Sequence, residues 1–205
     1  MPSTGPILRV VTRTVESPVG PHLAGVTEPV DPNEGPSLCL LEFTSRPRLS
    51  QAQSDLARLL ACPLEEQGEF ETATPATQLL DETQLQLAEY FANQRTAFDL
   101  PLLLPGTPFQ QKVWNALTEI PFGTTISYDT LAKRVGSVAR AVGGANGANR
   151  VPIVVPCHRV IGADGSLTGF GGGMHNKQRL LQHEGALLPL CKLHYSTVHA
   201  DTPQI

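Results

Sequence analysis

Short apolar runs alternate with turn-forming residues along the first hundred positions of the chain. The apolar and β-branched runs that suit strands are residues 7–15, 22–27 and 38–43. The segments whose apolar positions recur near the helical period are residues 52–60 and 76–93. Prolines and glycines at residues 17–20 and 28–37 predict a turn and a loop between the strands. This half of the chain therefore predicts a mixed α+β unit with a structural role.

The pattern changes after residues 100–106, a stretch with two prolines and a glycine where we place the domain boundary. Thr107 is a good N-cap and Pro108 suits the first helical position, so a helix begins there. Its apolar side chains, spaced to share one face, are Phe109, Val113, Trp114, Leu117 and Ile120.

A pair of short helices is predicted next. Ser127 can cap a helix over residues 128–135 that ends at Gly136, and Ser137 can cap a second helix. Two short helices joined by a glycine turn form a helix-turn-helix pattern, in which the second helix would present Arg140 to DNA. An ordinary αα-hairpin with solvated arginines has the same spacing, and spacing alone favours that simpler interpretation.

Glycine-rich segments surround the last apolar run of the chain. Residues 151–155 predict a buried strand, interrupted by Pro152, that leads into the sequence Pro-Cys-His-Arg at 156–159. The turn, the glycine-rich loop and the final helix that we expect next are residues 163–166, 168–173 and 176–184. The tail from residue 187 reads as poorly ordered.

Length and cysteine content limit the class of protein. A chain of 205 residues suits two small domains, which we place at 1–97 and 98–186, followed by a tail at 187–205. The four cysteines, at 39, 62, 157 and 191, have irregular spacing without a CxxC pair, so we expect neither a disulfide framework nor a zinc site. No apolar run approaches the ~20 residues of a membrane span. A soluble intracellular protein is expected.

Charge is distributed unevenly along the chain. Residues 1–105 hold 6 Lys+Arg against 14 Asp+Glu, whereas residues 106–185 hold 8 against 4. A net charge of −4 argues against a simple nucleic-acid-binding protein. The basic second half nevertheless suggests that this part of the chain meets a polyanion.

Cys157 is the candidate nucleophile. A free cysteine has a pKa of about 8.5, so it needs a neighbouring base or positive charge to ionise at neutral pH. His158 and Arg159 follow directly, and a bend after Pro156 or one bridging water would connect His158 to the sulfur. Glu184 is the best-placed carboxylate to complete a Cys–His–acid relay. Taken alone, Pro-Cys-His is a weak signal, and a buried cysteine beside a surface histidine is its commoner explanation.

The surrounding segments decide between these interpretations. Residues 143–162 (GGANGANRVPIVVPCHRVIG) strongly resemble the O6-alkylguanine-DNA alkyltransferase family, also called methylated-DNA–protein-cysteine methyltransferases. The other matching segments are residues 107–114 (TPFQQKVW), 126–128 (ISY), 139–142 (ARAV), 167–169 (LTG) and 180–185 (LLQHEG). The resemblance is dense and collinear over about residues 98–186.

The resemblance implies a fold and a reaction. The N-terminal domain would be α+β and ribonuclease-H-like, and a mostly helical winged-helix domain would follow and carry the active site. The protein would move an alkyl group irreversibly from O6-alkylguanine, and from O4-alkylthymine, in DNA to Cys157, once per molecule and without cofactor or metal. It would bind double-stranded DNA through the minor groove as a monomer, without a membrane. We expect it in the cytoplasm, or in the nucleus of a eukaryote.

The resemblance also implies roles for particular residues. The residues that would perform the reaction are Cys157 as acceptor, His158 and Glu184 as its activating partners, Asn149 as brace and Tyr128 as proton donor to the leaving guanine. The residues that would contact DNA are Arg140, which fills the gap left by the flipped base, and Ser127, Tyr128, Ala139 and Gly143. The residues that would form the substrate pocket are Val160, Phe170, Gly171 and Lys177.

Two positions depart from the family pattern. Phe170 stands where the family usually has tyrosine, and Gly171 stands where a larger residue is common. We therefore expect a roomier pocket that accepts bulky alkyl groups.

Three other functions compete with this interpretation. A non-catalytic sensor of alkylated DNA would lack the cysteine, whereas Cys157 is present. A Cys–His hydrolase would turn over repeatedly and leave Arg140 without a purpose. A plain winged-helix DNA-binding protein would give a sequence-specific footprint.

Overall fold

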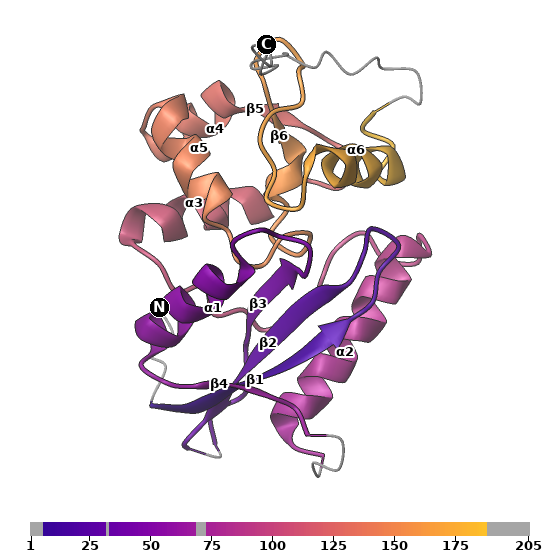
Figure 1. The fold of residues 1–205 in the computed structure, drawn as a ribbon. Helices are drawn as coiled ribbons and strands as arrows, with labels where there is room; N and C mark the ends of the chain where they lie inside the picture. The colour runs from indigo at the N-terminus through magenta and orange to yellow at the C-terminus, as the bar shows by residue number, and fades with distance from the viewer. Residues whose placement is uncertain (1–5, 32, 69–72, 188–205) are drawn as a thin grey trace, which may run out of the picture.

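The computed structural model describes residues 6–31, 33–68 and 73–187, and the N-terminal part is built on one sheet (Figure 1). The four strands are β1 (Ile7–Val15), β2 (His22–Pro29), β3 (Leu38–Phe43) and β4 (Leu64–Glu66). Their order in the sheet is β3-β2-β1-β4, antiparallel except that β4 is parallel to β1. The three predicted strands are present, and β4 was not predicted. The tail from residue 188 and Cys191 lie outside the described residues.

Two helices accompany this sheet, α1 (Leu49–Leu60) and α2 (Pro75–Phe91). A capping box starts α2, in which Thr77 N donates to Thr74 Oγ1 at 3.2 Å and Thr74 N donates to Thr77 Oγ1 at 2.8 Å. The apolar stripe expected for this helix is buried and packs on β1 and β2. Because this packing fixes α2 on the sheet, the last turn of the helix is held next to the second half of the molecule (Figure 1).

The second half is mostly helical. Its elements are α3 (Pro108–Thr118), β5 (Ile126–Ser127), α4 (Tyr128–Val135), α5 (Ala139–Gly147), the 3₁₀ helix η1 (Cys157–Arg159), β6 (Val160–Ile161) and α6 (Met174–His183). The predicted caps Thr107 and Ser127 both accept backbone hydrogen bonds through their side chains. Gly136 ends α4 in the left-handed conformation with φ of 66°. β5 and β6, which were not predicted, form a two-stranded parallel sheet.

Two local predictions were wrong. Ser137 does not cap α5, because its N–H donates to Ala132 O at 2.9 Å and so belongs to the closing turn of α4; Val138 takes the N-cap position. Residues 151–155 form irregular turns rather than a strand. This apolar run is enclosed by side chains from both halves instead of pairing along a ladder, and Ile153 has a φ of 76°, which no regular strand permits.

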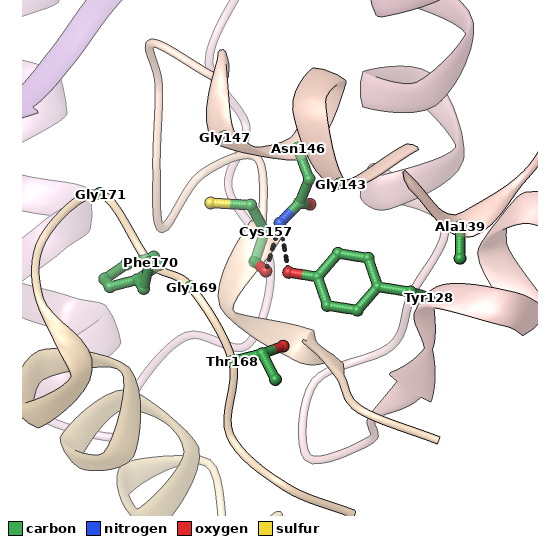
Figure 2. Close-up of a pocket in the computed structure, with 10 residues that line it drawn as sticks. All are labelled: Tyr128, Ala139, Gly143, Asn146, Gly147, Cys157, Thr168, Gly169, Phe170 and Gly171. Carbon is green, nitrogen blue, oxygen red and sulfur yellow. Dashed lines mark hydrogen bonds between the residues drawn. The ribbon is translucent and has the colours of Figure 1, made fainter. Parts of the chain in front are cut away.

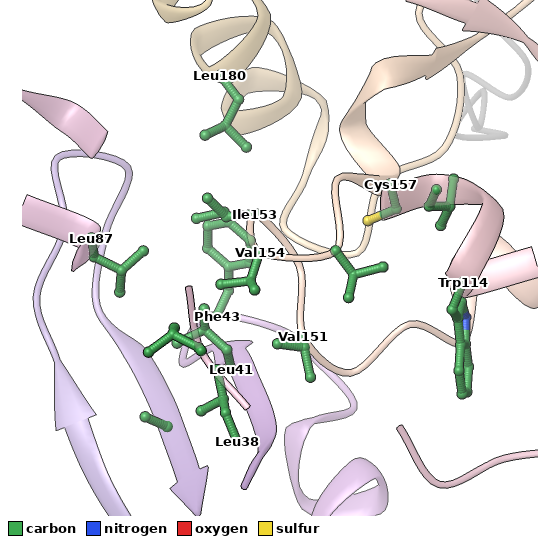
Figure 3. Close-up of a cluster of buried hydrophobic side chains, with 14 of the residues drawn as sticks. Leu38, Leu41, Phe43, Leu87, Trp114, Val151, Ile153, Val154, Cys157 and Leu180 are labelled. Atoms are coloured by element: carbon green, nitrogen blue, oxygen red, sulfur yellow. The ribbon is translucent and has the colours of Figure 1, made fainter. Parts of the chain in front are cut away.

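One hydrophobic core joins the two halves (Figure 3). Its members from separate elements include Leu41 and Phe43 of β3, Leu87 of α2, Trp114 of α3, Val154, and Leu180 of α6. The outer edge of β3 is also covered, because Leu41 N donates to Arg150 O at 2.8 Å and Leu38 N donates to Pro101 O at 2.8 Å. The segment that leads to Cys157 is therefore held against the N-terminal sheet. The domain division at residue 97 stays a prediction.

Candidate active site

Cys157 opens η1 directly after Pro156. Proline fixes its own φ and provides no N–H, which suits a sharp entry into a 3₁₀ turn. The Cys157 side chain is free and almost buried, and it lines a cavity of about 540 Å³ (Figure 2). The other residues that line this cavity are Tyr128, Ala139, Gly143, Asn146, Gly147, Thr168, Gly169, Phe170 and Gly171. A bend after Pro156, one of the two arrangements considered for connecting His158 to the sulfur, is thus present.

Asn149 braces the segment before the cysteine. Its Nδ2 donates to Val155 O at 2.9 Å, and its Oδ1 accepts from Val151 N at 3.0 Å. A positive φ is unfavourable for a β-branched residue, so Ile153 between these two bonds stores local backbone strain. The buried amide of Asn149 offsets this strain by closing the turn on both sides.

His158 is fully buried and contacts a buried carboxylate. Its Nε2 lies 2.9 Å from Glu184 Oε1, which is the contact that the sequence suggested. An ionised carboxylate can only accept, so Nε2 carries the proton of a neutral imidazole and Nδ1 keeps a lone pair. Nδ1 has no hydrogen-bond partner among the described residues. His158 is therefore arranged to accept a proton at Nδ1.

Glu184 accepts hydrogen bonds from several other groups. Arg159 donates through Nε to Oε2 at 3.0 Å and through Nη2 to Oε1 at 2.9 Å, and Tyr90 Oη donates to Oε1 at 2.7 Å. Burial alone would raise the pKa of Glu184, but hydrogen bonds from His158 and Arg159, together with the positive charge of Arg159, outweigh it and hold this pKa at about 2. The carboxylate is thus ionised beside a neutral histidine, whose own pKa is lowered by burial.

The resting thiol of Cys157 is protonated. Burial raises its pKa to about 11, despite the opposing effects of the Asn149 side chain and the positive charge of Lys177. The low-pKa thiolate that is typical of exposed reactive cysteines is therefore absent at neutral pH. Reaction at Cys157 requires a base that removes the proton as the bond forms.

Lys177 is fully buried behind the cavity wall. Its Nζ donates to Val160 O and to Thr168 O, both at 2.6 Å, and lies 6.0 Å from the ring centre of Tyr128. Burial lowers the pKa of Lys177 to about 8. Lys177 and Val160 were predicted to form the substrate pocket, but they are not among the residues that line the cavity, whereas Phe170 and Gly171 are. Lys177 instead joins β6 to the loop that carries Phe170.

The helix pair α4–α5 forms one side of the cavity. Ala139 and Gly143 line it, and Ser127 is occupied as the N-cap of α4. Arg140 is exposed on α5 and makes no hydrogen bond or ion pair with the described residues. Its side chain is therefore free to engage a partner outside the protein.

The N-terminal half supports two of the segments that line the cavity, without lining it itself. Arg46, just after β3, donates to Glu42 Oε1 and, through Nη2, to Gly147 O at 3.2 Å. A Cβ on Gly171 would lie 3.3 Å from Cζ of Arg46, so the missing side chain of Gly171 faces Arg46. A Cβ on Gly172 would overlap the Phe43 ring. The loop that carries Phe170 thus rests on two N-terminal side chains.

The sequence did not predict the roles of Asn146 and Tyr90, or the pairing of Arg159 with Glu184. Asn146 lies three positions before Asn149 within the matching segment, and Arg159 directly follows His158, so both could have been proposed from their place in the motif. Tyr90 had no such signal, since a tyrosine on the apolar face of a helix is usually a core residue.

No group of three or more His, Cys, Asp or Glu side chains in the described ranges could hold a metal ion. No helix within those ranges is long and apolar enough to cross a membrane.

The comparisons with known proteins agree with one another. Residues 49–104 match the ribonuclease-like domain of 6-O-methylguanine DNA methyltransferase, and residues 108–186 match the DNA binding domain of the same family. A methylated-DNA–protein-cysteine methyltransferase of Mycobacterium bovis is 42% identical over 180 residues, which cover 86% of this chain and 93% of that protein.

Solved structures give the same result. The O6-methylguanine methyltransferase of Mycobacterium tuberculosis superimposes with a TM-score of 0.65 at 38% identity, over 88% of this chain and 96% of that chain. The same organism's protein in complex with DNA superimposes with a TM-score of 0.62 at 36% identity, over 86% of this chain and 93% of that chain. The chain therefore belongs to the methylated-DNA–protein-cysteine methyltransferase family, with a ribonuclease-like N-terminal domain followed by a DNA-binding domain.

Proposed function

We propose that this protein repairs alkylated DNA by transferring the alkyl group from O6 of guanine to its own Cys157. The observation that carries the proposal is a buried cysteine on a cavity beside a helix-turn-helix, followed in the chain by a histidine bound to an ionised carboxylate. A related protein has been solved in complex with DNA, which supports DNA as the partner.

The transfer is a displacement at the alkyl carbon. The thiol proton of Cys157 passes to Nδ1 of His158 through a bridging water, while the sulfur forms a bond to that carbon. The bond from the carbon to O6 breaks, its electron pair remains on guanine, and Tyr128 donates the proton that neutralises the leaving guanine. Glu184 stabilises the imidazolium formed on His158, because the two are already hydrogen-bonded.

The product cannot regenerate the enzyme. A thioether on Cys157 has no good leaving group, so the reaction stops after one event per molecule. No step of this displacement uses a redox change or a cofactor. O4-alkylthymine offers the same type of leaving oxygen, and we include it in the substrate class.

The DNA-binding domain would reach the lesion by base flipping. The alkyl carbon lies within the stacked duplex, so the nucleotide must rotate out of the helix before Cys157 can attack. The pair α4–α5 with the β5–β6 sheet suits a winged helix, and the small residues Ala139 and Gly143 would let α5 approach the minor groove closely. The exposed Arg140 would occupy the space of the flipped base.

The setting of the reaction follows from its substrate. We place the protein in the compartment that holds DNA, which is the cytoplasm of a bacterium or the nucleus of a eukaryote. One chain carries the whole cavity, so a monomer suffices for the reaction.

The decisive experiment is intact mass spectrometry after mixing the protein with a duplex that contains one O6-methylguanine. A gain of one methyl group, about 14 Da from the replacement of a thiol hydrogen by CH₃, mapped to Cys157 and limited to one per molecule, is the expected result. Binding to the lesion without mass gain would favour the sensor function. Repeated turnover would favour a hydrolase.

A further inference from the structure

Asn146 links the proposed acid to the backbone of the nucleophile. It lies on α5, is almost buried and lines the cavity. Its Nδ2 donates to Oη of Tyr128 at 3.3 Å and to the carbonyl oxygen of Cys157 at 3.4 Å, as Figure 2 shows. One side-chain amide thereby connects α5, the first turn of α4 and η1.

The orientation of this amide is determined by its neighbours. The carbonyl oxygen of Cys157 can only accept, so the atom of Asn146 that faces it must be the nitrogen. Exchanging nitrogen and oxygen would bring two acceptors together. Oδ1 is buried and has no partner among the residues that the structure describes, so the two bonds from Nδ2 are what holds the amide.

This orientation determines where the proton of Tyr128 points. Because the phenolic oxygen accepts from Asn146, its single proton is not used on that amide. Lys177, close to the ring of Tyr128, can only donate. Thr168 also hydrogen-bonds to Tyr128, and its hydroxyl favours the ionised phenol when it donates. With Asn146, Lys177 and Thr168 all donating, the proton of Tyr128 is left for an acceptor in the cavity, where the substrate would lie.

We infer that Asn146 is a positioning residue that aims the proton of Tyr128 at the leaving guanine. The inference rests on the proposed function and concerns its second half, the protonation of guanine as the C–O6 bond breaks. The proton gained by guanine comes from Tyr128, and the proton lost by the Cys157 thiol passes to His158. The two transfers balance when the imidazolium of His158 loses its proton and the phenolate of Tyr128 gains one, by exchange through solvent.

Electrostatics agree with this geometry. Burial raises the pKa of Tyr128, and hydrogen bonds from Thr168 and Asn146 oppose that effect. Removing the amide of Asn146 would make Tyr128 a weaker acid as well as a less well oriented one. Substrates that need strong protonation of the leaving group should therefore suffer most.

The test compares two free bases, which removes DNA binding from the measurement. One is O6-benzylguanine, and the other is an O6-benzyl purine with an electron-withdrawing imidazole ring, whose leaving anion needs less protonation. The readout is the rate of mass gain on Cys157. The variants are Asn146→Leu and Asn146→Ala, which both lack the donor but differ in size, with Asn115→Leu on an exposed face of α3 as the matched control.

With either variant we expect the rate on O6-benzylguanine to fall about five- to tenfold, the effect of one lost hydrogen bond. On the electron-poor base we expect a loss of less than about twofold, because the acid contributes less there. In a Tyr128→Phe background, Asn146→Leu should produce no further loss, since both residues would act on one step. Asn115→Leu should match the wild type.

Four results would overturn the inference. The first three are an unchanged rate on O6-benzylguanine, equal losses of rate on the two bases, and an additive loss in the Tyr128→Phe background. The fourth is a wild-type rate in Asn146→Leu together with a reduced rate in Asn146→Ala, which would mean that Asn146 acts only by filling space. Thermal unfolding shows whether either Asn146 variant is misfolded, and the rates of the correctly folded variant are then used for the test. A wild-type protein that gains no mass on Cys157 would overturn the proposed function, and this role with it.

Discussion

The phenolic oxygen of Tyr90 lies 2.7 Å from Oε1 of Glu184, although the two residues are 94 positions apart in the sequence. The same carboxylate oxygen contacts Nε2 of His158 at 2.9 Å. The ribonuclease-like domain thus supplies one donor directly to the group that orients the candidate base. Aromatic contacts with Phe98 and Phe122 fix the ring of Tyr90, so its hydroxyl has little freedom to turn away.

Replacing Tyr90 with phenylalanine removes this hydroxyl and keeps the ring. We expect the free energy of unfolding to fall by about 1–3 kcal/mol, because a buried hydrogen bond to a charged acceptor is lost. The measurement is urea unfolding followed by fluorescence. Tyr128→Phe, which removes a hydroxyl with a longer contact of 3.3 Å, is the matched control and should lose less stability. Equal free energies of unfolding for Tyr90→Phe and wild type would contradict a stabilising hydrogen bond from Tyr90 to Glu184.

Stability should decrease in acid through Glu184. Its pKa is about 2 in the folded protein, below the value of about 4.3 expected for an unfolded chain. A depressed folded pKa gives stability that is fully present above about pH 4.3 and is lost as the pH falls through about 2. Glu184→Gln should remove this part of the acid dependence and, by leaving Arg159 buried without its counter-charge, cost about 3–5 kcal/mol at pH 7.

Chemical unfolding between pH 7 and pH 2 measures this difference. The curves of wild type and Glu184→Gln should converge toward low pH. Glu119→Gln, at an exposed position just after α3, is the surface control and should run parallel to the wild type. Parallel curves for Glu184→Gln as well would show that the carboxylate is not ionised in the folded protein.

The thiol of Cys157 should react slowly with iodoacetamide at neutral pH in the absence of DNA. Its pKa is raised to about 11, so the rate should increase about tenfold per pH unit between pH 8 and pH 10. Peptide mapping separates this reaction from that of the buried Cys39 and Cys62. A rate that levels off below pH 8 would indicate a thiolate in the resting protein.

Gly171→Ser tests the size selectivity of the cavity. A side chain at this position meets the guanidinium of Arg46 at 3.3 Å and has to displace it or turn toward the cavity. We expect the rate on a benzyl adduct, relative to a methyl adduct, to fall severalfold. The same substitution in an Arg46→Ala background, where space is available, should have a smaller effect. An unchanged benzyl-to-methyl ratio would remove the proposed roomier pocket.

Arg140→Ala should separate duplex DNA from small substrates. The side chain is exposed and lies outside the cavity lining, so the reaction with free O6-benzylguanine should stay near normal. Repair in duplex DNA should weaken at least tenfold, since unstacking a base costs a few kcal/mol that an inserted arginine offsets. Arg58→Ala, on the exposed side of α1, is the control for lost positive charge. Equal loss on both substrates would exclude the role of Arg140 in base flipping.

Local signals in the sequence were sufficient for most elements. Thr107, Ser127 and Gly136 mark helix ends through side-chain or left-handed geometry that depends on few neighbours, and the structure confirms all three. The contact between His158 and Glu184 was also expected, although they are 26 positions apart in the sequence.

What failed depended on contacts between distant segments. The run 151–155 reads as a strand because β-branched residues suit both a ladder and a packed core, and only the position of β3 decides between them. The hydrogen-bond partner of the Tyr90 hydroxyl could not be predicted, since that partner, Glu184, is 94 positions away in the sequence. The error at Ser137 was different, because it was local: its N–H closes the preceding helix on Ala132, a preference that its side chain does not reveal.

The shared core limits how far the catalytic half can be treated as a portable module. Leu41 and Phe43 of the sheet support the segment that carries Cys157, and Phe43 lies where any side chain at Gly172 would have to be. If residues 98–186 were fused to a different N-terminal domain, the apolar surface that Leu41 and Phe43 cover would be exposed. Substitutions in the core of the ribonuclease-like domain should therefore change the rate of alkyl transfer as well as the stability. The residues on which catalysis depends are thus not confined to the DNA-binding domain.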